Sequence, residues 1–327
     1  MIAAPRSEQV LALCGGVGGA KLALGLYRVL GRDRLTLVVN TGDDFEHLGL
    51  NVSPDIDTVV YTLAGLADPE RGWGRAGESW HFMGALRDLA EDTWFNLGDC
   101  DLAMHVLRTE WLRRGGSLTA FTARAAGKLG IAARVLPMTD DSVRTIVATE
   151  EGELPFQHYF VRRRCEPPVR SIRFQGAETS RLTPELLDVL ARPLRAIVIC
   201  PSNPFLSVDP ILAVPELRAA LVNQSAPVVA VSPIIGGQAV KGPTAKMMSE
   251  LGIAVTTHSI AAHYEGLIDG LLIDSTDIAD RASVDLPVIA TNTLMRSLAD
   301  RERVAHDVLG FCDTLAQSPV SGLAGAG

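Results

Sequence analysis

The sequence predicts an α/β fold, with a mostly parallel sheet, helices on both faces and a small β-rich insertion. Short, wholly apolar runs alternate with longer amphipathic stretches along the chain. A strand that is apolar at every position is typical of a sheet covered by helices on both faces. Hydrophobic residues make up 47% of the 327 residues, which is enough for the large core that such a fold needs. These observations favour a core in which parallel strands alternate with helices.

The apolar runs that we interpret as strands come in a regular order. The first two are residues 10–14 and 35–39, and a helix is predicted between them over residues 20–30. Because helical stretches separate the strands, neighbouring strands should run parallel. Later strands are predicted at residues 196–200, 227–231, 253–256 and 270–273, and residues 66–125 are predicted to be mostly helical.

The segment from about residue 140 to 174 has a different pattern. Three β-rich runs are broken there by Glu-Gly and Pro-Pro, which is typical of short antiparallel strands rather than another βαβ unit. We therefore expect a core interrupted by an insertion and followed by a flexible tail. The boundaries are 1–139 for the first part of the core, 140–180 for the insertion, 181–317 for the second part and 318–327 for the tail.

Composition excludes several classes of partner. The net charge is −8 and no long block of Lys or Arg occurs, so we expect no nucleic acid. No run of about 18 uncharged apolar residues appears, so we expect no membrane span. The five cysteines form no CxxC pair, and the first residues lack the apolar run of a signal peptide. A cytoplasmic protein with reduced thiols is the expectation.

Four unusual motifs follow four of the predicted strands. They are "CGGVGGAK", "NTGDD", "PSNPFLSVDPIL" and "SPIIGGQAVKGPTAK". In a parallel sheet the carboxyl ends of all strands lie at one edge, and ligands bind there at the point where the strand order reverses. The motifs therefore predict a binding crevice at that edge.

The first glycine-rich loop is not a standard nucleotide fingerprint. A dinucleotide motif needs glycine where Lys21 stands and a carboxylate where the second strand ends in Asn40. A P-loop fails at Ala20 and Leu22. By itself the loop indicates either a phosphate-binding turn or only a tight turn between strand and helix.

A second glycine-rich loop and the "PSNP" motif add to the first. Each alone is compatible with ordinary turns. Together they favour a nucleotide with its diphosphate laid across two loops. The candidate binding residues are Gly15, Gly16, Gly18, Gly19, Lys21, Asn40, Ser202, Asn203, Ser232, Gly236, Gly237 and Lys241.

Carboxylates gather beside the first loop. Asp43, Asp44, Asp55 and Asp57 all fall within 17 residues of Asn40. They would repel an anionic ligand unless a cation lay between, and Mg²⁺ typically takes one or two carboxylates plus phosphate oxygens. Asp43 is also compatible with a turn, and Asp55 with a helix cap. Asp44 and Asp57 are therefore the candidate metal ligands and catalytic residues.

The stretch "NLGDCDLAMHVLR" is a further candidate. Asp99 is compatible with capping the predicted helix and Asp101 with its first turn, and contact with a substrate is an equal alternative for this pair. His105 is interpreted as structural. No Ser-His-Asp or Cys-His set is evident, which argues against covalent catalysis.

These motifs, taken in order, resemble the 2-phospho-L-lactate transferase family of coenzyme F-420 biosynthesis. The resemblance also includes "GLNVSPDIDTVVYTL", "RGWG" and "LPMTDD" and covers nearly the whole chain. It implies a Rossmann-like homodimer that uses Mg²⁺ and moves a phospho-three-carbon-acid group from a guanosine diphosphate-linked donor to the deazaflavin Fo, with release of GMP.

The resemblance also implies roles for particular residues. Asp44, Asp55 and Asp57 match the family's metal and acceptor aspartates. Asn96 stands where some members have lysine before "LGD", so the contact of that lysine with Fo is not expected here. The donor acid stays open among phospholactate, phosphoenolpyruvate and phosphoglycerate.

Two rival functions remain at this point. A non-catalytic regulator that binds nucleotide sugars would share the glycine loops but would not need the aspartate cluster. A NAD-dependent oxidoreductase is disfavoured by Lys21 and Asn40.

Overall fold

The computed structural model describes residues 7–31, 33–239 and 242–317. Lys241 and the predicted tail at 318–327 lie outside these residues. Within them the main sheet has seven strands in the order β14-β13-β10-β9-β1-β2-β5, and each neighbouring pair runs parallel. The strands are β1 (Val10–Cys14), β2 (Leu35–Val39), β5 (Arg134–Pro137), β9 (Ala196–Ile199), β10 (Val228–Val231), β13 (Gly270–Asp274) and β14 (Val288–Thr291).

Strand β1 lies inside the sheet, between β9 and β2, and its side chains are buried on both faces. All five of its residues are buried. Leu11 and Leu13 pack into one apolar core, whereas Val10, Ala12 and Cys14 pack into the other. Alternate side chains of a strand point to opposite faces, so an uninterrupted apolar run supplies both cores. The predicted fold class is confirmed.

The strand order reverses beside β1. The chain first moves from β1 to β2 on one side, with Val10 opposite Leu35. It later returns on the other side, where Ala196 of β9 lies opposite Val10. The loops after β1 and β9 therefore diverge at the carboxyl edge, which is the switch point at which such sheets bind ligands.

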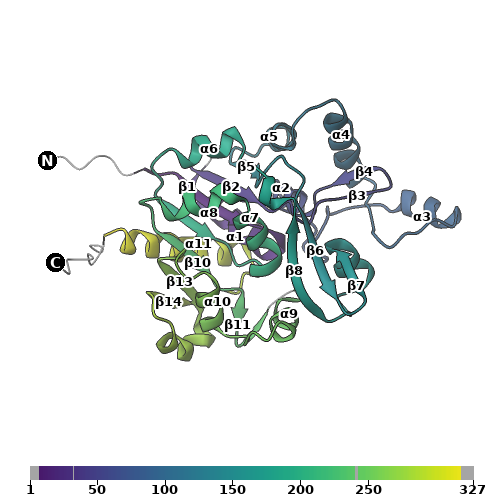
Figure 1. Ribbon diagram of the computed structural model, residues 1–327. Helices are drawn as coiled ribbons and strands as arrows, with labels where there is room; N and C mark the ends of the chain where they lie inside the picture. Colours follow the sequence, from purple (N-terminus) through teal and green to yellow (C-terminus); the bar gives the residue numbers. More distant parts are fainter. Residues whose placement is uncertain (1–6, 32, 240–241, 318–327) are drawn as a thin grey trace.

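Helices cover both faces of the sheet (Figure 1). One layer contains α1 (Gly16–Leu30), α2 (Pro54–Leu63) and α11 (Leu298–Leu315), and α1 packs against both of the others. Residues of α6 (Pro184–Leu190), α8 (Pro215–Val222) and α10 (Thr257–His263) belong to the other core. No helix in the described part of the chain is both long and apolar enough to span a bilayer.

The remaining elements surround the carboxyl edge. The helices are α3 (His81–Asp88), α4 (Asp101–Arg113), α5 (Leu118–Lys128), α7 (Asp209–Leu212) and α9 (Thr244–Glu250). The short turns of 3₁₀ or π type are η1 (His158–Arg162), η2 (Ala177–Thr179), η3 (Pro204–Val208) and η4 (Ser275–Ser283). Two hairpins pair β3 (Phe45–His47) with β4 (Leu50–Val52) and β11 (Ile234–Ile235) with β12 (Gln238–Ala239).

A small antiparallel sheet stands apart from the main sheet (Figure 1). Its order is β7-β6-β8, from β6 (Arg144–Thr149), β7 (Gly152–Pro155) and β8 (Val169–Gln175). Val147 and Tyr159 of this part pack with Leu206 and Met247 of the core. The β-rich insertion predicted from the Glu-Gly and Pro-Pro breaks is present.

Some predicted elements are wrong in place or kind. Residues 253–256 form no strand, because the chain turns there and Thr256 caps α10 by accepting a hydrogen bond from the Ser259 amide. Helix α1 begins at Gly16 and not at residue 20, so part of the glycine loop is helical. The strands β5 and β14 were not predicted, because β5 begins with the exposed Arg134 and three of the four residues of β14 are only partly buried.

Candidate active site

A cavity of about 540 Å³ lies at the carboxyl edge of the sheet. Loops that follow β1, β9 and β10 form one part of its wall, and α2 with the segments around Trp73 and Phe95 forms another. Of the sequence-predicted residues, the described ones lining it are Gly15, Gly16, Gly18, Lys21, Asp55, Asp57, Asn96, Ser202, Asn203 and Ser232.

The first glycine loop is held tightly by the chain itself. A Cβ on Gly18 would stand 2.4 Å from the carbonyl oxygen of Pro201, and one on Gly19 would stand 2.5 Å from the Ser202 hydroxyl. A Cβ on Gly15 would stand 2.6 Å from Asp55. Close packing between the loops after β1 and β9 therefore requires these glycines, quite apart from any ligand.

Asp55 joins the first two loops instead of capping its own helix. Its carboxylate accepts hydrogen bonds from the Gly16 amide at 2.8 Å and from the Asn40 side-chain amide at 2.9 Å. The side chain therefore lies against the N-terminus of α1, where negative charge is favourable. Burial raises the pKa of Asp55 to about 6, and the two hydrogen bonds oppose that rise.

Ser202 and Asn203 also hold loops in place. The Ser202 hydroxyl donates to the Gly15 carbonyl at 2.8 Å and accepts from the Gly15 amide at 3.3 Å. The Asn203 side-chain oxygen accepts from the amides of Phe205 and Leu206 and so caps η3. Both residues line the cavity while fixing the shape of its wall.

The second glycine loop is placed differently from the first. The amides of Gly236 and Gly237 each donate to the Asp277 carboxylate at 2.9 Å. Neither glycine is among the described residues that line the cavity, whereas Ser232 is. The Asp277 carboxylate thus takes the position at this turn that a ligand phosphate was expected to take. Lys21 lines the cavity, and its ammonium group donates to the Met295 carbonyl at 3.0 Å.

The four clustered aspartates divide between two cavities. Asp43, Asp55 and Asp57 line the large one. Asp44 lines a neighbouring cavity of about 110 Å³. One Asp44 oxygen accepts from the Ser53 hydroxyl at 2.7 Å, and burial raises the pKa of Asp44 to about 7. The two candidate metal ligands, Asp44 and Asp57, therefore line different cavities.

Asp57 belongs to a buried charged network with α4. One of its carboxylate oxygens accepts a hydrogen bond from the Arg108 guanidinium, and the other lies 3.7 Å from His105 Nδ1. His105 Nε2 in turn lies 3.4 Å from an Asp101 oxygen, and the Tyr61 hydroxyl donates to the other Asp101 oxygen at 2.5 Å. Burial raises the pKa of Asp57 while Arg108 opposes the rise.

This network contains the best geometric candidate for a metal centre. Ligand atoms of Asp57, Asp101 and His105 all lie within 4.8 Å of one another. The Asp57 oxygen that faces His105 has no hydrogen-bond partner among the described residues. A metal role for Asp101 and His105 was not predicted, since Asp101 was left open between the first helical turn and substrate contact, and His105 was interpreted as structural. The available signal was the spacing in α4, where His105 and Arg108 follow Asp101 by four and seven residues and so share its face of the helix.

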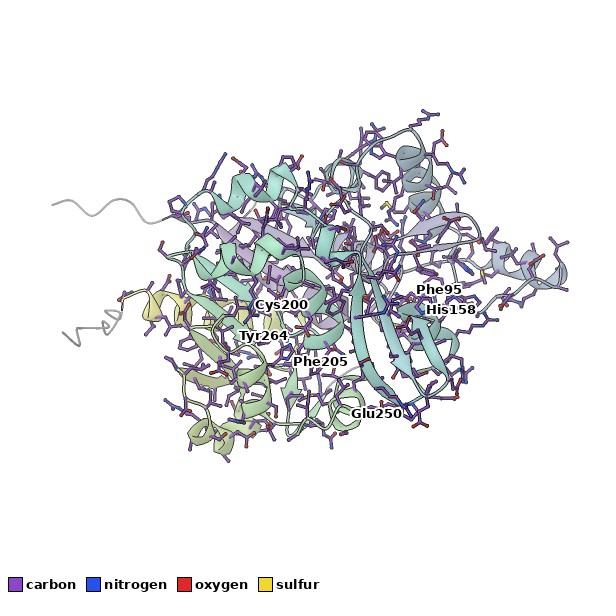
Figure 2. The ribbon with its side chains drawn as sticks, viewed as in Figure 1. Phe95, His158, Cys200, Phe205, Glu250 and Tyr264 are labelled. Carbon is purple, nitrogen blue, oxygen red and sulfur yellow. The ribbon has the colours of Figure 1, made fainter. Side chains whose placement is uncertain are left out.

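Aromatic side chains gather around the segment that carries Asn96. The rings of Trp94 and Phe95 are 5.6 Å apart, and Trp94 lies 4.7 Å from the His158 ring of the insertion. Figure 2 shows Phe95 and His158 near each other beside the small sheet. Asp92 also pairs with Arg162 at 2.8 Å, so this segment and the insertion are joined at two points.

The glycine turn, the switch point and the buried carboxylates define a doubly wound α/β protein with a ligand cavity at the sheet edge. The sequence matches the 2-phospho-L-lactate transferase CofD family over residues 10–308. The chain belongs to this family and is a transferase of coenzyme F-420 biosynthesis.

Individual relatives agree with the family match. A phosphoenolpyruvate transferase from Kitasatospora aureofaciens is 39% identical over 305 residues, covering 91% of this chain and 95% of the relative. A 2-phospho-L-lactate transferase from Methanopyrus kandleri is 40% identical over 308 residues, covering 93% and 97%. A crystal structure of a UPF0052 family member from Bacillus halodurans shares the fold, with a TM-score of 0.61 at 15% identity and coverage of 94% and 100%.

Proposed function

We propose that this transferase moves a phospho-three-carbon-acid group from its guanosine diphosphate-linked donor to the ribityl hydroxyl of the deazaflavin Fo and releases GMP. The observation that carries the proposal is the position of Asp57. It lines the same cavity as the glycine turn and the aromatic residues Trp73 and Phe95. A phosphate-binding end, a carboxylate and an aromatic end are what this transfer needs.

The glycine turn supports the assignment of the donor. Helix α1 begins at Gly16, has no side-chain cap and has no acidic residue in its first turn. Its N-terminus therefore offers backbone N–H groups to a diphosphate. Lys21 adds a positive charge at the same wall. The Asp55 carboxylate already holds the Gly16 amide, so the later amides of the turn are the ones proposed to bind phosphate.

The buried network supports the chemical role of Asp57. In the proposed reaction the acceptor oxygen forms a bond to the phosphorus that bears the acid, and the bond from that phosphorus to GMP breaks. Such transfers depend on alignment and charge stabilisation. Arg108 fixes one oxygen of Asp57, which leaves the other to orient the acceptor hydroxyl and take its proton.

The site suits a divalent cation, and Mg²⁺ is the proposed one. The carboxylate of Asp101 is an oxygen ligand of the kind that Mg²⁺ prefers. Asp101 would hold the ion, and Asp44 stays a proposed ligand from the neighbouring cavity, while the unpartnered oxygen of Asp57 serves the acceptor hydroxyl. The ion would neutralise charge on the diphosphate and on the departing GMP.

The identity of the three-carbon acid needs a direct experiment. Relatives of nearly equal identity are named for phosphoenolpyruvate and for 2-phospho-L-lactate, so identity does not choose between the acids. Purified protein with Mg²⁺ and Fo should be incubated separately with the guanosine diphosphate-linked forms of phospholactate, phosphoenolpyruvate and phosphoglycerate. We expect one of them to yield a phosphodiester of Fo and an equal amount of GMP. No product from any of the three would contradict the proposal.

Two further points belong to the proposal. A homodimer is proposed from the resemblance, and light scattering at several concentrations measures it. The alternative of a nucleotide-sugar-binding regulator predicts tight binding of the donor without any turnover, so the same incubations separate the two functions.

A further inference from the structure

The loop after α2 presents a single tryptophan to the cavity. Trp73 lies between Gly72 and Gly74, which have φ values of +77° and +68°. The Asp68 carboxylate accepts from the Arg71 amide at 3.0 Å, and the Gly72 amide donates to the Asp68 carbonyl at 3.0 Å. These bonds fix the turn, so Trp73 is held by an ordered loop.

Trp73 is supported on one side and open on the other. It makes a T-shaped contact with Trp80, with ring centroids 6.3 Å apart and an interplanar angle of 71°. The Arg71 guanidinium lies 4.6 Å from the Trp80 ring and holds that ring in turn. Trp73 nevertheless keeps 45% of its surface exposed while lining the cavity. An indole that is braced but exposed in a cavity is suited to stack on a planar ring.

Helix α2 shows which end of the cavity this tryptophan belongs to. Pro54, Asp57, Thr58 and Tyr61 line the cavity, and their spacing places them on one face of the helix. Asp55, in the first turn of α2, bonds to the glycine turn, whereas Tyr61 accepts the Ala67 amide of the Trp73 loop at its carbonyl. Trp73 therefore lies toward the end opposite the glycine turn.

The distance along that face suits the acceptor. Tyr61 follows Asp57 by four residues, which is about 6 Å along a helix axis. The Arg75 guanidinium of the Trp73 loop lies 5.7 Å from the Tyr61 ring. The loop that carries Trp73 thus meets α2 about one helical turn beyond Asp57, and a flexible polyol chain suits a hydroxyl at Asp57 joined to a ring at that end.

Further aromatic side chains line the cavity. Phe95 belongs to the same part of the wall as Trp73, whereas Phe156 and Phe160, whose rings are stacked 5.3 Å apart, line the cavity from the insertion. Phosphate and ribose are polar and gain little from contact with an aromatic surface, whereas a fused aromatic ring system is stabilised by stacking against it.

We propose that Trp73 is the stacking platform for the tricyclic ring of the acceptor and sets the preference for a fused-ring alcohol over a simple one. This inference rests on the proposed function, because it takes the acceptor to be a deazaflavin. The guanine base of the donor binds elsewhere, nearer the glycine turn.

The test compares three variants at this position. Trp73→Ala should raise KM for Fo by roughly tenfold to a hundredfold, since stacking of a base on an aromatic side chain is worth about 1–3 kcal/mol. The value of kcat and the affinity for GDP should change little. Trp73→Phe should retain most of the affinity. Trp73→Leu, which keeps apolar bulk without a π face, should behave like Trp73→Ala.

A spectroscopic readout does not depend on turnover. Titration of Fo into the wild-type protein should quench tryptophan emission, and Trp73→Phe should remove most of that quenching. Trp111→Phe is the matched control, because Trp111 bonds to the Ser117 carbonyl and is not among the described residues lining the cavity. It should leave both KM and quenching unchanged.

The outcomes distinguish failure of the Trp73 inference from failure of the proposed function. If wild-type protein transfers to Fo and Trp73→Ala keeps the wild-type KM, the stacking role of Trp73 is wrong and the proposed transfer reaction is unaffected. Loss of GDP affinity in Trp73→Ala would place guanine on this ring and also overturn the inference. If wild-type protein neither transfers to Fo nor shows Fo-dependent quenching, both fail.

Discussion

The guanidinium of Arg108 contacts one carboxylate oxygen of Asp57, and both side chains are buried. A buried charge without its partner is costly, so this pair fixes both the ionisation and the direction of Asp57. The pair joins α4 to α2 at the carboxyl edge of the sheet. It therefore ties the folding of the region to the geometry of the site.

Replacing Arg108 should lower the free energy of unfolding substantially. Arg108→Met leaves the Asp57 carboxylate buried without its cation, so we expect a loss of about 3–5 kcal/mol in the free energy of unfolding. In the double variant Asp57→Asn/Arg108→Met the orphaned charge is gone, and part of the stability should return. Denaturant unfolding of both single variants and the double variant measures the coupling. Additive losses would show that the two residues do not act as a pair.

The glycine turn gives a test of close packing. Gly18→Ala places a Cβ against the Pro201 carbonyl and should lower the melting temperature and weaken nucleotide binding. Gly84→Ala is the matched control, because Gly84 lies within α3 and its added Cβ meets nothing within 4 Å. The control should be neutral or stabilised by about 0.5–1 kcal/mol. Equal melting temperatures for the two variants would remove the packing argument.

The dependence of the rate on Mg²⁺ concentration distinguishes Asp101 from Asp44 as the metal ligand. If Asp101 holds the ion, Asp101→Asn should raise the Mg²⁺ concentration required for half-maximal rate, and should weaken the binding of Mn²⁺ measured by electron paramagnetic resonance. Asp44→Asn tests the ligand expected from the resemblance in the same way. Thermal melts control for folding. A wild-type Mg²⁺ requirement in both variants would exclude both residues as ligands.

Two histidines should contribute a loss of stability on mild acidification. Burial lowers the pKa of His47 and of His158 from the ordinary 6.5. At these two sites the folded state binds fewer protons than the unfolded chain, so their contribution to the free energy of unfolding drops as pH falls through 6.5 and levels off below the folded pKa. The raised pKa values of Asp44 and Asp55, about 7 and about 6, contribute in the opposite sense. The two histidine rings flank Trp94 at 5.3 and 4.7 Å.

The double variant His47→Phe/His158→Phe keeps the aromatic packing and removes these titrations. On acidification from pH 7 to 5 its free energy of unfolding should fall less, or rise more, than that of the wild type, with His306→Gln as a control on a distant helix. An unchanged pH profile in the double variant would show that other groups govern the acid response.

Most strands of the main sheet could be predicted from the sequence, because a strand that is buried on both faces is apolar at every position. The run from Val10 to Cys14 supplies both cores and is uniformly apolar for that reason. The edge strand β14 has no such signature, since three of its four residues are only partly buried. Residues 253–256 are apolar enough for a strand, but the Thr256 cap commits the chain to a helix.

The site was only partly predictable for a related reason. Asp55 and Asp57 stand two residues apart, so their proximity was visible in the sequence. The pairing of Asp57 with Arg108 crosses 51 positions and arises only when α4 packs beside α2. Likewise, nothing in the sequence around Gly236 indicates that Asp277, some 40 residues later, accepts a hydrogen bond from the Gly236 amide.

The most direct test of the account is single-turnover transfer to Fo by Asp57→Asn, measured beside calorimetric titration with GDP. Loss of a group that orients and deprotonates the acceptor typically costs about 10²–10⁴-fold in rate. We predict a loss of that size with GDP affinity close to wild type, because the nucleotide is proposed to bind at the glycine turn and not at Asp57. Transfer at the wild-type rate would contradict the central role given to Asp57.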